Sequence, residues 1–256
     1  HSTNHMAFHT GAAERMRILS AGNVGIGETA PLTKLHVKTA DSGASVASGA
    51  DEFVIEGSGT SGMTILSGTS GNGIINFGDS GSNEIGQVYY SHSSNNMVIA
   101  TNGATAVNVD SAGIVTQPLQ PSFMIQQTTS ISVANTHTIF SSGTTEQWDT
   151  NADFATNGSF TAPVTGKYVL CMNILYKNIS NDTLYEPFIK SSNREYSFGK
   201  RTRAYSGDGT YLYCGGTVVA DMDANDTVYC AHYGGDPSDI SEHANNWSYF
   251  QGYLLG

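Results

Sequence analysis

Apolar and polar residues alternate in many short runs along the chain, and turns rich in glycine, serine and asparagine separate these runs. Examples in the first part of the chain are residues 52–57, 73–79, 85–90 and 96–101. Longer and more aromatic runs follow, such as residues 166–179. Alternation with a period of two places every second side chain on the same face of a strand. The pattern therefore predicts an all-β protein.

The N-terminal pattern recurs further along the chain. Residues 1–24 align without gaps to residues 92–115, and ten of the 24 positions are identical. The apolar alternation and a Ser-Ala-Gly turn agree in both copies. A strand-like run at 85–90 precedes the second copy, whereas the first copy stands at the start of the sequence. We therefore expect that a longer protein extends upstream of His1, with a similar strand just before it.

Composition changes at residues 117–121 (QPLQP). Before this stretch the chain has 17 glycines, 5 aromatic residues and no cysteine; after it the chain has 12 glycines, 20 aromatic residues and all three cysteines. A thread with so few large side chains can hardly bury a core alone, so we expect residues 1–117 to associate with copies of themselves. Residues 118–256 are long enough to form a core of their own. We predict a domain boundary between these two ranges.

A segment of the first part resembles a known class of viral proteins. Residues 13–37 (AERMRILSAGNVGIGETAPLTKLHV) contain a Gly-Asn-Val-Gly-Ile-Gly turn that leads through a proline to a Lys-Leu-His-Val strand. The order and spacing resemble a segment of bacteriophage tail-fibre and tail-spike proteins. The resemblance implies that residues 1–117 form a repetitive β shaft of three intertwined chains, that the shaft carries no chemistry, and that the protein belongs to the virion.

The second part resembles a different family. Three landmarks are similar to the globular head of complement component one, subunit q, which shares its jelly roll with the tumour necrosis factor group: FTAPVTGKYVL (160–170), DANDTVYC (223–230) and SYFQGYLLG (248–256). The resemblance implies a ten-stranded, two-sheet jelly-roll sandwich that packs as a homotrimer. The usual collagen stalk of that family, with glycine at every third residue, is absent. Because a viral-type shaft stands in its place, we do not expect the immune functions of the family.

Charge and hydropathy restrict the partners. The net charge is -11, with 11 lysine and arginine residues against 22 acidic ones. Nucleic acids and anionic membranes are bound by clustered cations, so we expect neither as a partner. No apolar run approaches the roughly 18 residues of a membrane span, so no insertion into a membrane is expected. Cys171, Cys214 and Cys230 have no metal-type spacing and are expected to be buried free thiols.

The sequence lacks the usual signatures of catalysis. Residues 57–62 (GSGTSG) match the string G-x-G-x-x-G, but no helical pattern follows them, so we interpret them as a linker. A G-x-S-x-G nucleophile elbow is missing, and the eight histidines occur in no arrangement that singles out a base. We expect neither enzymatic activity nor an organic cofactor.

One acidic stretch has two interpretations. In DMDAND (221–226), Asp221, Asp223 and Asp226 alternate like the front half of a calcium loop. However, Asp226 takes the position of the expected glycine, and His232 takes that of the final glutamate. A turn between two strands explains the same residues, because aspartate and asparagine favour turns. Some heads of the resembled family bind calcium near the trimer axis. A Ca²⁺ site and a plain turn both remain open.

Basic and aromatic residues near turn signals are candidates for binding a cell surface. KRTR (200–203) is the basic cluster of this acidic chain. Guanidinium groups bind phosphates and acidic sugars, and aromatic rings stack on sugar rings. Alternatively, the cluster is a solvated loop and the aromatic rings belong to the core. The candidate receptor-binding residues are Lys200, Arg201, Arg203, Tyr205, Tyr233, Asp236 and Trp247.

Three functional hypotheses follow. The leading one is the tip of a homotrimeric phage tail fibre that binds a receptor on the host cell surface, a glycan or a protein, and that continues upstream into the rest of the fibre. In the first alternative, the head is a structural trimerisation cap and binds no receptor. In the second, the head is a secreted, lectin-like protein of cellular origin.

Overall fold

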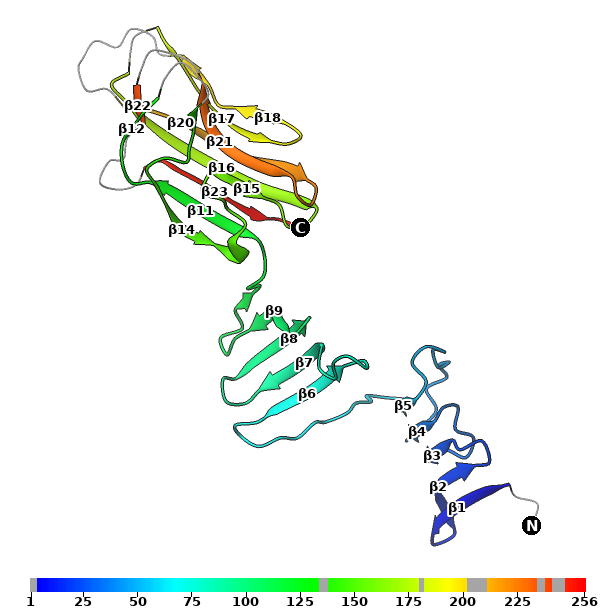
Figure 1. The fold of residues 1–256 in the computed structure, drawn as a ribbon. Helices are drawn as coiled ribbons and strands as arrows, with labels where there is room; N and C mark the ends of the chain where they lie inside the picture. Colours follow the sequence, from blue (N-terminus) through cyan, green and yellow to red (C-terminus); the bar gives the residue numbers. More distant parts are fainter. Residues whose placement is uncertain (1–3, 134–137, 180–181, 202–210, 234–237, 241–246) are drawn as a thin grey trace. The chain divides into compact units, whose positions relative to one another are not determined.

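The computed structural model describes residues 4–133, 138–179, 182–201, 211–233, 238–240 and 247–256 (Figure 1). These residues form strands, turns and one short 3-10 helix, and no α-helix occurs among them. The prediction of an all-β protein is therefore confirmed. None of the described residues belongs to a helix long and apolar enough to cross a membrane. The chain separates into two compact units, residues 1–74 and 75–256.

The first unit contains one five-stranded sheet. Its strands pair in the order of the sequence: β1 (His5–Thr10), β2 (Ala13–Leu19), β3 (Val24–Ile26), β4 (Leu35–Lys38) and β5 (Phe53–Glu56). The pairs from β1 to β3 are antiparallel, whereas β3, β4 and β5 run parallel. No large hydrophobic side chain is buried among the described residues of this unit. A single sheet without a second layer has nothing to pack its apolar face against.

The second unit begins with another sheet of five strands. Their order is that of the sequence: β6 (Asn72–Phe77), β7 (Gly86–Ser91), β8 (Asn96–Thr101), β9 (Ala104–Val109) and β10 (Val115–Thr116). Val98 and Ala100 on β8 are the buried hydrophobic residues of this sheet in the part of the chain that the structure describes. Like the first sheet, this one has almost no core of its own.

The two sequence copies fold alike. β1 begins at residue 5 and β8 begins 91 positions later, at residue 96. In both hairpins, β1–β2 and β8–β9, the pairing register shifts between the fourth and fifth residues of the first strand. The turn after each hairpin contains a glycine in the left-handed region, Gly22 with φ +82° and Gly113 with φ +81°. A side chain at such φ values is strained, which explains why both copies keep a glycine there.

Two sheets packed face to face form the rest of the second unit, residues 122–254 (Figure 1). The first, called the β16 sheet, has the order β12 (Ile131–Val133), β22 (Ser238–Ile240), β16 (Gly166–Lys177), β23 (Tyr249–Leu254), β11 (Ser122–Gln127) and β14 (Thr144–Asp149), with β20 (Leu212–Met222) also paired to β16. The second, called the β17 sheet, has the order β13 (Thr138–Ile139), β21 (Thr227–Tyr233), β17 (Leu184–Ser191) and β18 (Glu195–Ser197), with β15 (Ser159–Thr161) on β21 and β19 (Lys200–Arg201) on β17.

The chain crosses between the two sheets repeatedly, for example from β16 to β17, from β19 to β20, from β20 to β21 and from β21 to β22. This is the predicted jelly-roll sandwich. Its described residues form thirteen strands, six of which are pieces of two or three residues, so the expected count of ten strands is not confirmed.

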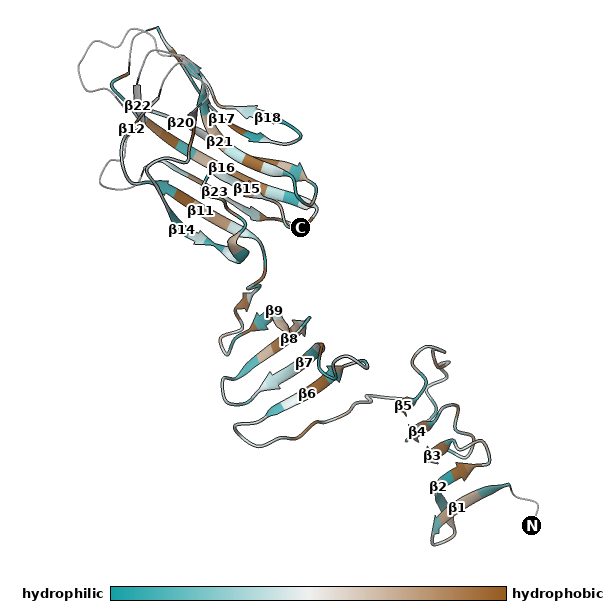
Figure 2. Ribbon diagram, viewed as in Figure 1, coloured by the Kyte–Doolittle hydropathy of each residue, from teal (hydrophilic) through white to brown (hydrophobic). Residues whose placement is uncertain are grey.

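The core lies between the sheets. Along β16, Tyr168, Leu170 and Met172 point into it and are at most 1% exposed, which is the alternation seen in the sequence (Figure 2). The ring of Phe123 on β11 stacks on that of Phe160 from the other sheet, with centroids 4.6 Å apart. Aromatic rings joined across the two layers explain why the residues after 121 are so rich in these side chains.

Candidate functional site

The side chains of the β16 sheet that point away from the core form an outer face. Val169 on β16 pairs with Tyr253 on β23 and with Val219 on β20, so these three side chains form a row across the sheet. Tyr253 is 49% exposed and Val219 53%. The row is apolar over three strands, and it lies open in the single chain.

Two further rows flank the first. Trp148, Met124, Gln251, Cys171 and Thr217 are aligned across five strands, and Gln126, Tyr249, Asn173 and Gly215 across four. None of the residues in the three rows is charged. The next row is charged, with Lys167 paired to Asp221, and the two flanking rows contain polar residues such as Gln251 and Asn173. Exposed large side chains such as Trp148, Tyr253 and Val219 are of the kind that mark interaction sites.

The three cysteines are free. Cys214 and Cys230 are buried as expected, and burial raises the pKa of the Cys214 thiol to about 11. The prediction for Cys171 was wrong: it is only partly buried, because it alternates with core residues along β16 and lies on the outer face. Its sulfur lies 3.9 Å from the hydroxyl of Tyr249.

Three of the candidate receptor-binding residues lie at one end of the sandwich, called the far end, where β16 ends and β17 begins. Lys200 pairs with Tyr185 near the start of β17, and Tyr233 pairs with the next residue, Glu186. The carbonyl of Trp247 accepts a hydrogen bond of 2.7 Å from the Nδ2 of Asn173.

The far end lies opposite the point where the chain enters the sandwich. Ser122, the first residue of β11, pairs with Tyr253, which in turn pairs with Val169 near the start of β16.

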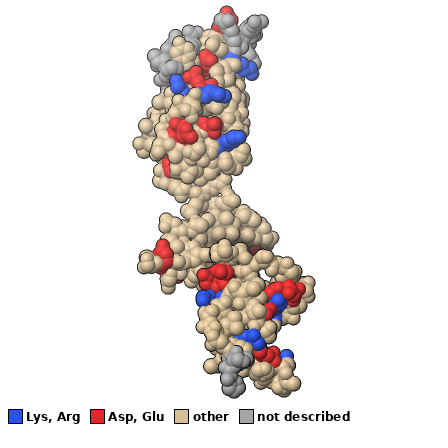
Figure 3. Space-filling model, turned by 90° about the vertical axis from the view of Figure 1, so that its right-hand side faces the viewer, with Lys and Arg blue, Asp and Glu red and all other residues tan. Residues whose placement is uncertain are grey.

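Acidic and basic side chains are interspersed over the face of the sandwich seen in Figure 3, with neither sign forming a continuous patch. Of the other candidates, Arg201 belongs to β19, but its side chain is not described; Arg203, Tyr205 and Asp236 lie outside the described residues.

The acidic stretch at 221–226 forms the turn between β20 and β21. The Oδ2 of Asp226 accepts hydrogen bonds from the backbone N–H of Asp223 at 2.9 Å and from the Nδ2 of Asn193 at 2.6 Å. Asn225 has a φ of +74°, as expected in a tight turn. These interactions use one oxygen of Asp226 to hold the turn, and Asp221 precedes it at the end of β20. The calcium site stays a prediction.

The sequence analysis missed a group of ionisable residues in the first unit. Nε2 of His36 on β4 lies 2.8 Å from Oε2 of Glu56 on β5, and Nζ of Lys38 lies 2.9 Å from Oε2 of Glu28. His36 is fully buried. Alternation along β4 places His36 and Lys38 on the same face, but the parallel pairing with β5 left no signal in the sequence.

Glu28, His36 and Glu56 each offer a ligand atom within 4.8 Å of the others, and no other such group occurs among the described residues. The ammonium of Lys38 already lies between the two carboxylates, 3.4 Å from Oε2 of Glu56. A metal ion would have to displace it. We therefore interpret the group as a network of ion pairs that joins the loop after β3 to β4 and β5.

This network makes the first unit sensitive to acid. The backbone N–H and hydroxyl of Ser42 donate to Oε1 of Glu56 at 2.7 and 2.9 Å, and with Lys38 they lower the pKa of Glu56 to about 2. A carboxyl with a lowered pKa stabilises the fold above its ordinary pKa, about 4.5, and this contribution disappears as the pH falls towards 2.

We predict that Glu56→Gln lowers the melting temperature of the first unit at pH 7, because the glutamine cannot form the ion pairs. The difference from the unchanged protein should shrink between pH 4.5 and pH 2, where Glu56 itself becomes neutral. Thermal unfolding followed by circular dichroism at several pH values measures this difference. A difference that stays constant down to pH 2 would contradict the assignment.

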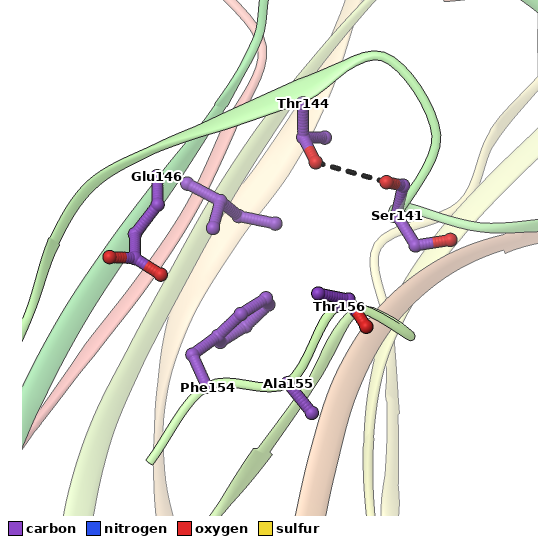
Figure 4. Close-up of a pocket in the computed structure, with 8 residues that line it drawn as sticks. Ser141, Thr144, Glu146, Phe154, Ala155 and Thr156 are labelled. Atoms are coloured by element: carbon purple, nitrogen blue, oxygen red, sulfur yellow. Dashed lines mark hydrogen bonds between the residues drawn. The ribbon is translucent and has the colours of Figure 1, made fainter. Parts of the chain in front are cut away.

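A small pocket opens between β11, β14 and the segment before β15 (Figure 4). Its volume is about 220 Å³, and its walls include Ile125, Phe154, Glu146 and Thr144, whose Oγ1 donates to the carbonyl of Ser141 at 3.1 Å. Glu146 is the one ionisable residue among those that line it. The other polar groups of the lining are the hydroxyls of Ser141, Thr144 and Thr156.

Comparison with protein-family profiles and with curated proteins finds no match. Among solved structures, the globular domain of zebrafish complement 1qA protein is 16% identical, with a TM-score of 0.38 over 53% of this chain and 98% of that one. Eiger TNF from S. frugiperda is 12% identical, with a TM-score of 0.41 over 54% and 92%. Murine APRIL is 11% identical, with a TM-score of 0.39 over 53% and 99%. With TM-scores below 0.5 and identities of 11–16%, these likenesses carry no argument about the function of this chain.

Proposed function

We propose that this chain is part of a homotrimeric viral tail fibre in which residues 118–256 form the tip and bind a receptor on the host cell surface. Residues 1–117 then belong to the shaft, and the rest of the fibre precedes them. The protein is thus part of the virion and acts by binding, without enzymatic activity or an organic cofactor.

The main support for self-association comes from the side chains on the outer face of the β16 sheet. Its three rows contain exposed aromatic and aliphatic side chains and no charged residue. Burial of apolar surface contributes about 25 cal/mol per Å², so copies that cover this face gain stability from it. Trp148 is 47% exposed, and together with Tyr253 it offers the kind of aromatic anchor that interfaces favour.

The sheets before residue 118 support the same conclusion. Large hydrophobic side chains are exposed on their strands, among them Met6 at 60%, Phe77 at 58% and Phe53 at 50%. Two single-layered sheets cannot cover these residues from within. Neighbouring copies of the chain can, which agrees with the resemblance of residues 13–37 to viral fibre proteins.

If copies cover the outer face, the far end and the β17 sheet remain accessible. Lys200, Tyr233 and Trp247 lie at the far end, away from the entry of the chain. Three identical sites on one tip let weak contacts, each about millimolar, combine into firm attachment. The chemistry of the candidates, ammonium, phenol and indole, suits a polar glycan.

Two other functions compete with this one. A trimerisation cap would use the outer face in the same way but would bind no host surface. A secreted, lectin-like head would also be trimeric, but it offers no explanation for the repeated sheets that precede the sandwich. An assay of binding to bacterial cells distinguishes a receptor-binding tip from a trimerisation cap, because only the tip would bind.

We predict that the protein is a trimer in solution and that the double change Tyr253→Asp and Val219→Asp dissociates it. The two carboxylates would be buried without partners in the interface, at a cost of several kcal/mol. Light scattering coupled to size-exclusion chromatography measures the mass. Leu184→Asp on β17, where Leu184 is 42% exposed, is the matched control and should leave the trimer intact. A monomeric unchanged protein would refute the proposal.

We further predict that replacing Arg201, Arg203, Tyr205 and Trp247 together with alanine abolishes adsorption to host cells while the trimer remains folded. Labelled protein is incubated with a panel of bacterial strains and the bound fraction is counted, with Lys190→Ala, at the opposite end of β17, as a control. If a strain that binds the unchanged protein binds the quadruple variant equally well, the far end is not the receptor site. If no strain binds either protein, the cap becomes the better account.

A further inference from the structure

β5 is an edge strand well inside the chain. It is the last strand of the first sheet and pairs in parallel with β4, and the described residues place no strand on its other side. The carbonyl of Glu52, just before β5, faces β4 and accepts a hydrogen bond of 2.9 Å from the N–H of Leu35. Because backbone groups alternate in direction along a strand, those of Phe53 and Ile55 point to the outer edge, where a further strand can pair with them.

Two apolar ladders cross the parallel strands β3, β4 and β5. They consist of Val24, Leu35 and Phe53, and of Ile26, Val37 and Ile55. Both ladders end at β5, where Phe53 is 50% exposed. A parallel strand that continues them needs an apolar residue at every second position.

Residues 63–66 (MTIL) have this pattern. If they are set beside β5 in parallel, with Met63 next to Phe53, the first ladder continues through Met63 and the second through Ile65. In the structure these four residues belong to no strand. Met63 is 57% and Ile65 44% exposed. The chain thus contains both an edge without a strand and a strand-like segment without a sheet.

The length of the connection favours another copy of the chain as the source of this segment. A chain that adds a parallel strand beside its last one must first return past the whole strand. The first unit does so twice, with eight residues between β3 and β4 (27–34) and 14 between β4 and β5 (39–52). The connection from β5 to residue 63 has six residues (57–62) and is shorter than either. The same segment from a second copy is under no such limit.

A homotrimer can supply that copy to all three chains. The contact joins two different surfaces of the chain, the edge of β5 and residues 63–66. Contacts of this kind close into a ring when successive copies are related by a rotation of a third of a turn. Each copy then donates one segment and accepts one, so that all three β5 edges are filled.

We infer that residues 63–66 of one copy form a parallel strand on the outer edge of β5 in the next copy, so that the three chains exchange strands within the shaft. The inference rests on the proposed homotrimer and names one contact that joins the first units. It pairs the outer backbone groups of β5 and covers Met63 and Ile65.

The double change Ile55→Cys and Ile65→Cys tests this inference on the full chain. Neighbouring strands lie about 4.8 Å apart, which is within the Cα separation that a disulfide spans. Cys171→Ser is included because Cys171 is the partly exposed native thiol. We expect oxidation to link the three chains, so that a denaturing gel without reductant shows a trimer band that reductant removes.

The matched control combines Ile55→Cys with Leu32→Cys in the same background. Leu32 is 61% exposed in the loop between β3 and β4 and continues neither ladder, so this variant should give no linked chains. Light scattering under native conditions measures the mass of each variant and of the unchanged protein.

The outcomes separate this inference from the proposed function. A trimeric mass without links between chains, a link formed within one chain, or equal linking in the control overturns the inference and leaves the homotrimer standing. A monomeric mass of the unchanged protein refutes the homotrimer, and the inference with it.

Discussion

The structure depends on one constraint: a β-sheet buries an apolar face only where a second layer packs against it. The sandwich meets this constraint within one chain, since the ring of Phe123 in one sheet stacks on that of Phe160 in the other, with centroids 4.6 Å apart, and also packs against Phe250 of its own sheet at 5.0 Å. The sheets of residues 5–116 are single layers and leave their apolar side chains exposed. The difference in glycine and aromatic content between the two parts of the sequence reflects this difference in architecture.

The same constraint applies to the outer face of the β16 sheet. Alternation gives every strand of the sandwich a second face, and on most soluble proteins that face is charged. Here three of its rows carry no charge and include the exposed Trp148, Tyr253 and Val219. Charged residues begin with the next row, Lys167 and Asp221. The single-layered sheets and the outer face of the sandwich thus share one property: each has apolar side chains that nothing within the single chain covers. The proposed self-association would cover both at once and would leave the far end of the sandwich accessible.

Local features of the fold could be predicted from the sequence, whereas contacts between distant strands could not. The alternation was sufficient to predict an all-β protein, and the Ser-Ala-Gly turns of the repeat agree with the turns at Gly22 and Gly113 after the two hairpins. The network around His36 depends on the parallel pairing of β4 with β5, which leaves no pattern in the sequence. The partial exposure of Cys171 also follows from which face of β16 packs against the second sheet, and composition contains no information about that.

Cys171 offers the most direct test of whether copies of the chain cover the outer face. Its thiol lies on that face and is partly exposed in the single chain, while Cys214 and Cys230 are buried and serve as internal references. The protein is treated with a thiol reagent under native conditions and labelling at each cysteine is followed by mass spectrometry. A covered face predicts that Cys171 is protected like the other two in the native protein, and that it alone becomes reactive in the Tyr253→Asp, Val219→Asp variant. Rapid labelling of Cys171 in the unchanged protein would contradict the account.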